Sequence, residues 1–530
     1  MRTLPGIDDL AALADRATAL AGSLGPAAAA STSVGQERAI LRMFGVTGID
    51  RAGRPLAAEV IGRYMGTDPT RLAGGIALPF AMAAAEYDLE AHELALEVAA
   101  GNVDLAVEAE LLVQPERRAT AVAHATRLGR IGLDRIDANR FARRELLALL
   151  GDPPRPWIGG GLAEPAIVDA VEEAGGLVDA GVEVVLVDTP PGRELADRLA
   201  RRSITLEPWR PSPTSRSGLE APDTAGRPVP TGSHRALGVL RRAVDEAGAR
   251  RRGYVRLATD APALAAPDQA VISAFERIDL VVADPMREIV IGQVDPLRAL
   301  ADHAFGHRLH ARAGTVVVIP AGPLVVAPDL EAGHPSDPAT LCGRSLALQL
   351  VAVALALRDG LPAASISIGA LPDWLVDERD APARAAAEVA LRRALLPAHG
   401  LAFLEPSLDG DRATAWSALV AALLADAGPV DLILARPGRS LPSRIRATRA
   451  AAAASAGLSE VLEPSALRGL ALEHASGAVR AAEATLAQIE SGAWRALVTS
   501  MAHAEEGGLG ADAVATRTER FDPLEGTAPA

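Results

Sequence analysis

The chain has 530 residues, of which 49% are hydrophobic and 3% aromatic, so a large core of Ala, Leu, Val and Ile is expected and a disordered chain is excluded. The formal net charge of −14 argues against a nucleic-acid partner, because no broad basic face could neutralise phosphates. A single cysteine, Cys342, excludes a disulfide framework and fits a reducing cytoplasm.

The chain contains no lysine, and all 53 of its basic residues are arginine. It therefore cannot form a side-chain Schiff base with pyridoxal phosphate or with a carbonyl substrate. It also cannot supply the lysine of a phosphate-binding P-loop.

Residues 1–150 are predicted to be entirely helical, because apolar residues recur at helical spacing throughout them. The predicted helices are 7–22, 35–45, 54–65, 76–87, 91–100 and 104–127. The first contains Asp8, Asp9 and Asp15 within its apolar stretch, which indicates an amphipathic helix and not a signal peptide. The turn sequence "GDPPRP" (151–156) is the predicted domain boundary.

Eight short β-rich runs follow, each succeeded by a helix-length amphipathic stretch. They are 155–159, 182–188, 253–258, 278–284, 314–319, 364–369, 401–405 and 430–436. Strands that alternate with helices predict a parallel sheet, and eight such units over roughly 300 residues favour a closed (β/α)₈ TIM-type barrel. The alternative is an open doubly wound sheet, which needs a glycine fingerprint after its first strand. "IGGGLAEP" (158–165) does not have the GxGxxG spacing.

We therefore expect an α/β fold with a helical region over 1–150, a barrel over 151–460, and C-terminal helices with a Gly-rich tail over 461–530. A Pro/Arg/Ser segment at 189–231 lies between the second and third strands, and a loop of that length is a lid, a partner surface or disordered. The apolar run at 345–357 is too short to span a membrane, so we expect a buried helix and no membrane partner.

Polar side chains stand where several of the predicted strands end, which in a barrel is the catalytic face. They are Asp188, Thr189, Thr259, Asp260, Asp284, Glu405 with Ser407 and Asp409, and Arg436. A ring of carboxylates suits metal binding or acid–base chemistry. The alternative is that these residues only terminate strands and cap the helices that follow.

Two further motifs have ordinary explanations beside functional ones. His303 and His307 have the i, i+4 spacing of a zinc pair, but there is no HExxH glutamate, and Arg308 and Arg312 would repel a cation. We therefore predict no metal site. Thr231 and Ser233 precede an arginine-rich helix and could hold a phosphate, or could simply cap the helix.

The chain resembles a known family, the α subunit of lysine 5,6-aminomutase, from about Thr32 into the C-terminal tail. The similar segments are "TSVGQERAILRMFGVTGID" (32–50), "EVAAGNVDL" (97–105), "AVDEAGARRRGYVRL" (243–257), "AFERIDLVVAD" (274–284), "ADHAFGHR" (301–308) and the tail at 507–523. The resemblance implies a barrel with helical additions that works with adenosylcobalamin and pyridoxal 5'-phosphate on a small amino acid. It also implies a β-type partner subunit that carries the cobalamin-binding domain and the lysine for pyridoxal phosphate, which would account for the missing lysine.

The sequence departs from that family at the positions that bind cofactor and substrate. Asp188 stands where the resemblance implies an arginine, and Arg193 or Glu194 where it implies a serine. Thr259 and Asp260 replace an asparagine and a tyrosine. A following serine is Pro262, an aromatic after the next strand falls on Arg287, and an acidic-amide pair falls in "IPAGPLVV" (319–326).

Three hypotheses follow from the sequence. The chain is a working aminomutase subunit, an isomerase component with altered substrate preference; or it is a degenerate, non-catalytic barrel that partners or regulates another chain; or it is a metal-assisted barrel enzyme of another class. The candidate residues that face cofactor or substrate are Asp188, Thr189, Arg193, Thr259, Asp260, Asp284, Arg287 and Glu405. On its own the chain is expected to be inactive.

Overall fold

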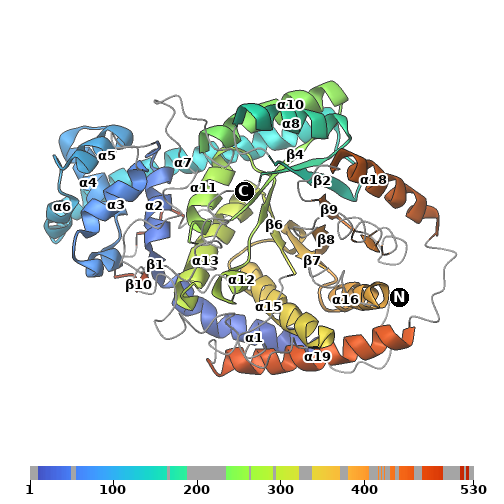
Figure 1. Ribbon diagram of the computed structural model, residues 1–530. Helices are drawn as coiled ribbons and strands as arrows, with labels where there is room; N and C mark the ends of the chain where they lie inside the picture. The colour runs from blue at the N-terminus through green and yellow to red at the C-terminus, as the bar shows by residue number, and fades with distance from the viewer. Residues whose placement is uncertain are drawn as a thin grey trace.

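The computed structural model describes residues 10–48, 55–163, 167–187, 234–261, 264–290, 294–321, 337–370, 380–404, 416, 419–420, 423, 430–435, 441–458, 468–492, 514–518 and 521–524. The long segment 189–231 lies outside the described residues. Figure 1 shows a barrel with helices around it, and a separate group of helices on one side of the barrel.

Eight strands form a closed barrel, in which each strand pairs with the next along the chain and the last pairs with the first. All of these pairings are parallel. The strands are β2 (Trp157–Gly161), β3 (Val184–Val187), β4 (Arg256–Asp260), β5 (Leu280–Val282), β6 (Val316–Ile319), β7 (Ile366–Gly369), β8 (Gly400–Leu404) and β9 (Leu432–Ala435). The predicted barrel and its eight strands are confirmed, and the open doubly wound sheet is excluded.

The predicted end of the third barrel strand was wrong. The sequence predicts a strand over 253–258, but β4 continues through Asp260. Thr259 pairs with Val187 of β3, and Asp260 pairs with Val282 of β5, so ladder pairing on both sides extends the strand beyond its apolar run.

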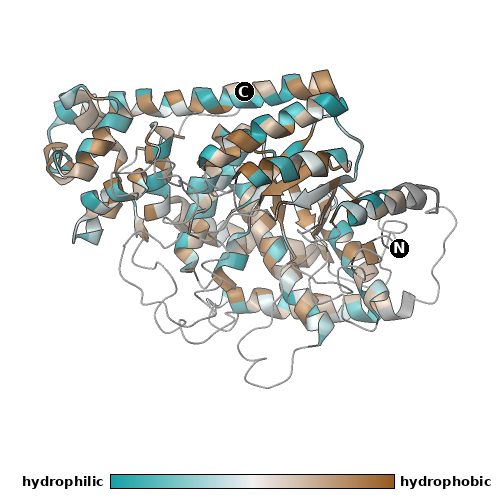
Figure 2. Ribbon diagram, turned by 45° about the horizontal axis from the view of Figure 1, so that its top comes forward, coloured by the Kyte–Doolittle hydropathy of each residue, from teal (hydrophilic) through white to brown (hydrophobic). Residues whose placement is uncertain are grey.

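Helices surround the barrel in the order expected of βα units. They are α8 (Ile167–Asp179), α10 (His234–Arg251), α11 (Ala266–Phe275), α12 (Pro285–Val290), α13 (Pro296–Ala313), α15 (Pro338–Arg358), α16 (Ala381–Leu395), α18 (Leu441–Leu458) and α19 (Arg468–Glu490). Figure 2 shows hydrophobic residues concentrated on the strands, whereas the surrounding helices mix hydrophobic and hydrophilic residues.

Two apolar layers follow from the alternation of side chains along each strand. Every second residue along a strand faces the barrel interior. Ala258, Val282 and Leu434, for example, belong to the cluster inside the barrel. Their neighbours, such as Leu257 and Val281, belong to the cluster between the strands and the outer helices. Cluster membership therefore tells which way each strand residue faces.

The N-terminal region is mainly helical, as predicted, but its prediction as entirely helical was wrong. Its helices are α1 (Leu10–Ala29), α2 (Val34–Met43), α3 (Leu56–Met65), α4 (Ala77–Tyr87), α5 (Ala91–Ala100), α6 (Leu105–Leu111) and α7 (Pro115–Leu150), with a 3₁₀ turn at Pro69–Gly74. β1 (Ser31–Ser33) pairs antiparallel with β10 (Val514–Thr516) in the tail. The predicted helix at 104–127 is in fact two helices, because α6 ends at Leu111 and Pro115 starts α7.

The first helix belongs to the barrel side of the molecule. Leu13, Ala17 and Leu20 of α1 lie in the outer core of the barrel, and Figure 1 shows α1 running beside α15 and α19. The other N-terminal helices enclose a second core that also takes in α11 and α13. The division of the chain at 150 and 460 stays a prediction.

One described helix, α15, is long and apolar enough to cross a membrane by length and composition. Most of its side chains are buried within the protein, against helices that include α1 and α19. The helix predicted at 345–357 is therefore a longer core helix.

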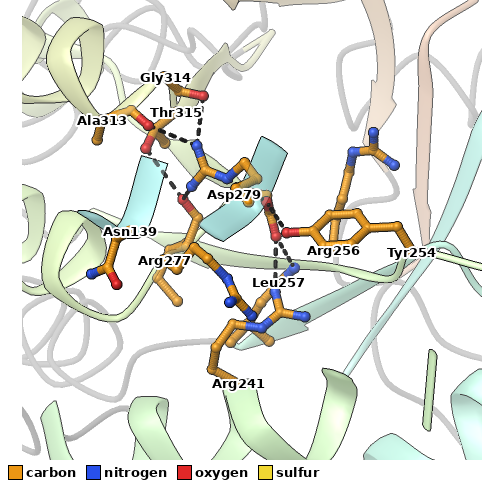
Figure 3. A network of polar contacts seen from close by, with 12 residues as sticks. Asn139, Arg241, Tyr254, Arg256, Leu257, Arg277, Asp279, Ala313, Gly314 and Thr315 are labelled. Atoms are coloured by element: carbon orange, nitrogen blue, oxygen red, sulfur yellow. Dashed lines mark hydrogen bonds and ion pairs between the residues drawn. The ribbon is translucent and has the colours of Figure 1, made fainter. Parts of the chain in front are cut away.

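The amino ends of the strands are tied together by ion pairs and hydrogen bonds around Asp279, shown in Figure 3. Tyr254 Oη donates to Asp279 Oδ1 at 2.7 Å, and Arg241 Nη1 donates to Oδ2 at 2.9 Å. From α7, Arg143 donates to the carbonyls of Ala313 and Gly314, each at 2.8 Å. The long helix α7 is thereby fixed to the base of the barrel.

Candidate functional site

The carboxyl ends of the barrel strands form the face on which barrel enzymes carry their chemistry. Four of the eight candidate residues lie outside the described residues: Asp188, Thr189, Arg193 and Glu405. The other four can be placed. They are Thr259 and Asp260 at the end of β4, and Asp284 and Arg287 after β5.

Thr259 and Asp260 face opposite sides of the barrel wall. Ala258 lies in the interior cluster and Leu257 in the outer one, so alternation turns Thr259 outward and Asp260 inward. The contacts of Thr259 agree, because Gln269 Nε2 on α11 lies 3.3 Å from its hydroxyl. Thr259 is fully buried there. Only Asp260 of this pair points into the mouth of the barrel.

Asp284 follows β5 and caps α12, where its Oδ1 accepts a hydrogen bond from the Met286 N–H at 2.9 Å. Burial raises the pKa of Asp284 to about 6, and His303 and the backbone N–H groups of Met286 and Arg287 offset only part of that effect. The carboxyl is therefore available as a proton donor or acceptor near neutral pH. Arg287 itself is exposed on α12.

A buried set of charged residues lies behind this face, and sequence reasoning identified it only in fragments. His303 Nε2 and Glu288 Oε1 are 2.9 Å apart, and the pKa of His303 is raised because Glu288 outweighs the lowering effect of burial. Asp302, the preceding residue, bonds to Ser33 at the start of α2. Burial raises the pKa of Asp302 to about 6, against the lowering effects of Arg298 and Ser33.

The same N-terminal helix, α2, is also anchored to α11, by buried ion pairs. Arg38 and Arg42 of α2 each contact Asp268 at 2.7 Å, and all three side chains are almost completely buried. Burial raises the pKa of Asp268, but the two guanidinium groups outweigh it and hold the pKa below its usual range. Helix α2, which lies within a segment that carried part of the resemblance, therefore joins the helical region to the barrel helix α11.

Two of the three histidines of α13 have carboxylate partners. His303 pairs with Glu288, and His307 Nδ1 lies 3.0 Å from Asp359 Oδ2. Burial and the neighbouring histidines lower the pKa of His310 to about 3, so it is neutral. This histidine group is part of the interior and not an open ligand set.

Another group of potential metal ligands lies between α15, α16 and α19. Donor atoms of Cys342, Glu388 and His474 lie within 4.8 Å of one another. However, Arg392 Nη1 contacts Glu388 at 2.5 Å, and burial together with Glu388 raises the pKa of the Cys342 thiol. A cation there would meet a neutral thiol and a buried guanidinium, so these residues do not fit a metal.

The described carboxyl ends also do not fit the phosphate group of pyridoxal phosphate. The last residues of the eight strands are Gly161, Val187, Asp260, Val282, Ile319, Gly369, Leu404 and Ala435. Among these, only Asp260 is charged, and its charge is negative. An anionic phosphate needs hydrogen-bond donors or cations there.

The family model for the D-lysine 5,6-aminomutase TIM-barrel domain of the alpha subunit matches residues 8–205 and 226–411. The lysine 5,6-aminomutase alpha subunit of Fusobacterium nucleatum is 26% identical over 351 residues, covering 64% of this chain and 59% of that protein. The lysine 5,6-aminomutase alpha subunit of Acetoanaerobium sticklandii is 25% identical over 342 residues, with the same coverage of 64% and 59%. The chain thus aligns with about three fifths of each relative's length.

Among solved structures, dihydropteroate synthase from Anaplasma phagocytophilum superposes on 57% of this chain and 98% of its own. Its TM-score is 0.33 at 11% identity, which supports no inference about this chain. The family-model match covers more than half of the residues and includes seven of the eight strands of the closed barrel, β2 to β8. The chain therefore belongs to the family of D-lysine 5,6-aminomutase alpha-subunit TIM-barrel domains.

Proposed function

We propose that the chain is the α-type subunit of an aminomutase, an isomerase that depends on adenosylcobalamin and pyridoxal 5'-phosphate. The reaction would be a 1,2-amino shift on lysine or a related diamino acid. The observation that carries the proposal is the family match over residues 8–205 and 226–411, together with the closed barrel, of which the match covers seven strands. The names of the two bacterial relatives support the same activity.

The chain's own residues argue that the cofactors are held largely by a partner. Without lysine, no side chain of this chain can form an imine with pyridoxal phosphate. The described strand ends offer no cation for its phosphate. We therefore propose a β-type partner that carries both the cobalamin-binding domain and the required lysine, and a heteromeric complex located in the cytoplasm. Neither nucleic acid nor a membrane is part of the proposal.

Asp260 gives the site a preference in substrate charge. Its carboxylate faces the barrel interior at the end of β4, where the resemblance implies a neutral residue. A carboxylate attracts an ammonium group and repels a phosphate or a carboxylate. We infer that Asp260 binds an amino group of a diamino acid, and that the substrate preference differs from that of lysine 5,6-aminomutase.

A second candidate function is a non-catalytic barrel that partners or regulates another chain. The observation in its favour is the lack of any phosphate-binding side chain among the described strand ends. A metal-assisted enzyme has less support, because Asp284 caps a helix and Asp260 is the only carboxylate among the last residues of the eight strands. His303 and His307, behind this face, are already paired with carboxylates.

The test is an activity assay of the chain reconstituted with a β-type partner. D-lysine and L-β-lysine would be supplied with both cofactors, and product formation and cobalt–carbon cleavage would be followed. We expect turnover of these two substrates to be undetectable or far below that of a complete family member. An Asp260→Asn variant should lose any preference for substrates with a second amino group. If cobalt–carbon cleavage is not observed with any diamino acid that is tried, the non-catalytic barrel is favoured.

A further inference from the structure

The barrel contains a cavity at the end opposite to the candidate active site. Its volume is about 320 Å³, and its walls include the first residues of six strands: Trp157, Leu280, Val316, Ile366, Gly400 and Leu432. Strand ends of this kind belong to the amino-terminal face of the barrel. The cavity is therefore separate from the carboxyl-terminal face discussed above.

The cavity exists because residues that face the barrel interior at this level have small side chains or none. Ser367 of β7 pairs with Gly400 of β8, and both line the cavity. A Cβ atom at Gly400 would lie 2.3 Å from Asp431 Oδ2 and 3.3 Å from Ser367 Oγ. Any larger residue at this position would collide with Asp431. A glycine is therefore required at position 400 by the present packing, and it leaves this part of the cavity unfilled.

The charged residues of the wall leave one positive charge in excess. Arg155 forms an ion pair with Asp431 and stacks 4.6 Å above the centre of the Trp157 ring. Asp431 also accepts a hydrogen bond from the Leu401 N–H at 3.0 Å. Its carboxylate is thus already paired. The remaining cation is Arg393, in the last turn of α16.

Several hydrogen-bond donors of the wall have no partner. The Nε and Nη2 atoms of Arg393 are buried and make no hydrogen bond, and neither does Ser367 Oγ. Ser367 is only 4% exposed. His399 is 9% exposed, and neither of its ring nitrogens makes a hydrogen bond of normal geometry. Burial lowers the pKa of His399, which the nearby Leu396 carbonyl only partly offsets, so its ring is neutral and offers one N–H.

A ligand that complements this wall must be small, rich in acceptors and negatively charged. Arginine N–H groups, a hydroxyl and an imidazole N–H are the donors that bind carboxylates and phosphates in proteins. Buried donors without acceptors are unfavourable, so an anion that supplies acceptors is stabilised. We propose that the amino-terminal mouth of the barrel binds a small oxyanion, a carboxylate or a phosphate, through Arg393, Ser367 and His399.

The test is calorimetric titration of the full chain with potassium phosphate and, separately, with potassium acetate, at constant ionic strength with chloride as reference. We expect saturable binding of at least one of the two anions. Arg393→Gln should weaken it by about tenfold or more, because it removes the charge and the paired donors. Ser367→Ala should weaken it less. Arg130→Gln, on the exposed side of α7, should bind like the wild type.

Folding of the variants is checked by their melting temperatures in chloride, which should stay close to wild type because the unpartnered atoms make no hydrogen bonds. Saturable binding of phosphate but not acetate would identify a phosphate site. Saturable binding of acetate but not phosphate would identify a carboxylate site. The proposal is overturned if neither anion binds saturably. It is equally overturned if Arg393→Gln and Ser367→Ala bind the anion as tightly as the wild type does. Because the readout is binding by the chain alone, the result does not depend on aminomutase activity.

Discussion

Replacing Asp284 with asparagine should change the pH dependence of stability in a defined direction. Burial raises the pKa of Asp284 from 3.8 to about 6 in the folded chain. A raised carboxyl pKa means that the folded state favours the protonated form. The resulting stabilisation is complete below about pH 4 and is lost as the pH rises through about 6, where the buried carboxyl must ionise.

The magnitude follows from the difference between the two pKa values. One pKa unit corresponds to about 1.4 kcal/mol, so the wild type should lose ~3 kcal/mol of unfolding free energy through this group between pH 4 and pH 8. Asparagine keeps an oxygen that can accept the Met286 N–H bond but has no titrating proton. Asp284→Asn should therefore gain stability relative to the wild type as the pH increases.

Urea unfolding of both proteins at a series of pH values between 4 and 8 measures this difference. The other titrating groups, His303 and Glu288 included, are common to the two proteins and cancel to first order. The result that refutes the reasoning is a stability difference that stays constant over this range, or one that shifts toward the wild type as the pH rises.

Two further predictions concern other buried or missing charges. Asp268→Asn should lower the unfolding free energy at pH 7 by about 3–5 kcal/mol, because Arg38 and Arg42 would face a neutral amide. Since the pKa of Asp268 is depressed, this loss should shrink as the pH falls below the ordinary range of aspartate, and urea unfolding that showed the same loss at every pH would contradict it. Borohydride reduction of the isolated chain with pyridoxal phosphate should leave no adduct on an internal peptide by mass spectrometry, because the chain has no lysine; a reduced internal adduct would be the contrary result.

The barrel could be predicted because each strand is a short apolar run followed by a helical stretch. Local sequence carries that signal. The pairing of β1 with β10 could not be predicted, because each strand has only three residues and almost the whole chain separates them. The direction of Asp260 was also hidden, since it depends on the strand continuing two residues beyond its apolar run.

The buried ion pairs were missed for a related reason. The sequence shows Arg38 and Asp268 as separate charged residues on two amphipathic helices, where solvent exposure is the ordinary expectation. Their contact depends on how α2 packs on α11, which no local pattern records. The segment "DHAFGHR" (302–308) indicated a histidine spacing and a family resemblance, but the partners of its histidines, Glu288 and Asp359, lie outside it.

Co-expression with a β-type chain that carries a cobalamin-binding domain and a pyridoxal-phosphate lysine tests the central claim most directly. The complex would be separated by size-exclusion chromatography and its cobalamin and pyridoxal absorbance recorded. We predict that the two chains elute together with both cofactors, and that the chain alone elutes without either. Elution of the chain separately from such a partner, with no cofactor absorbance in common, would contradict its role as an aminomutase subunit.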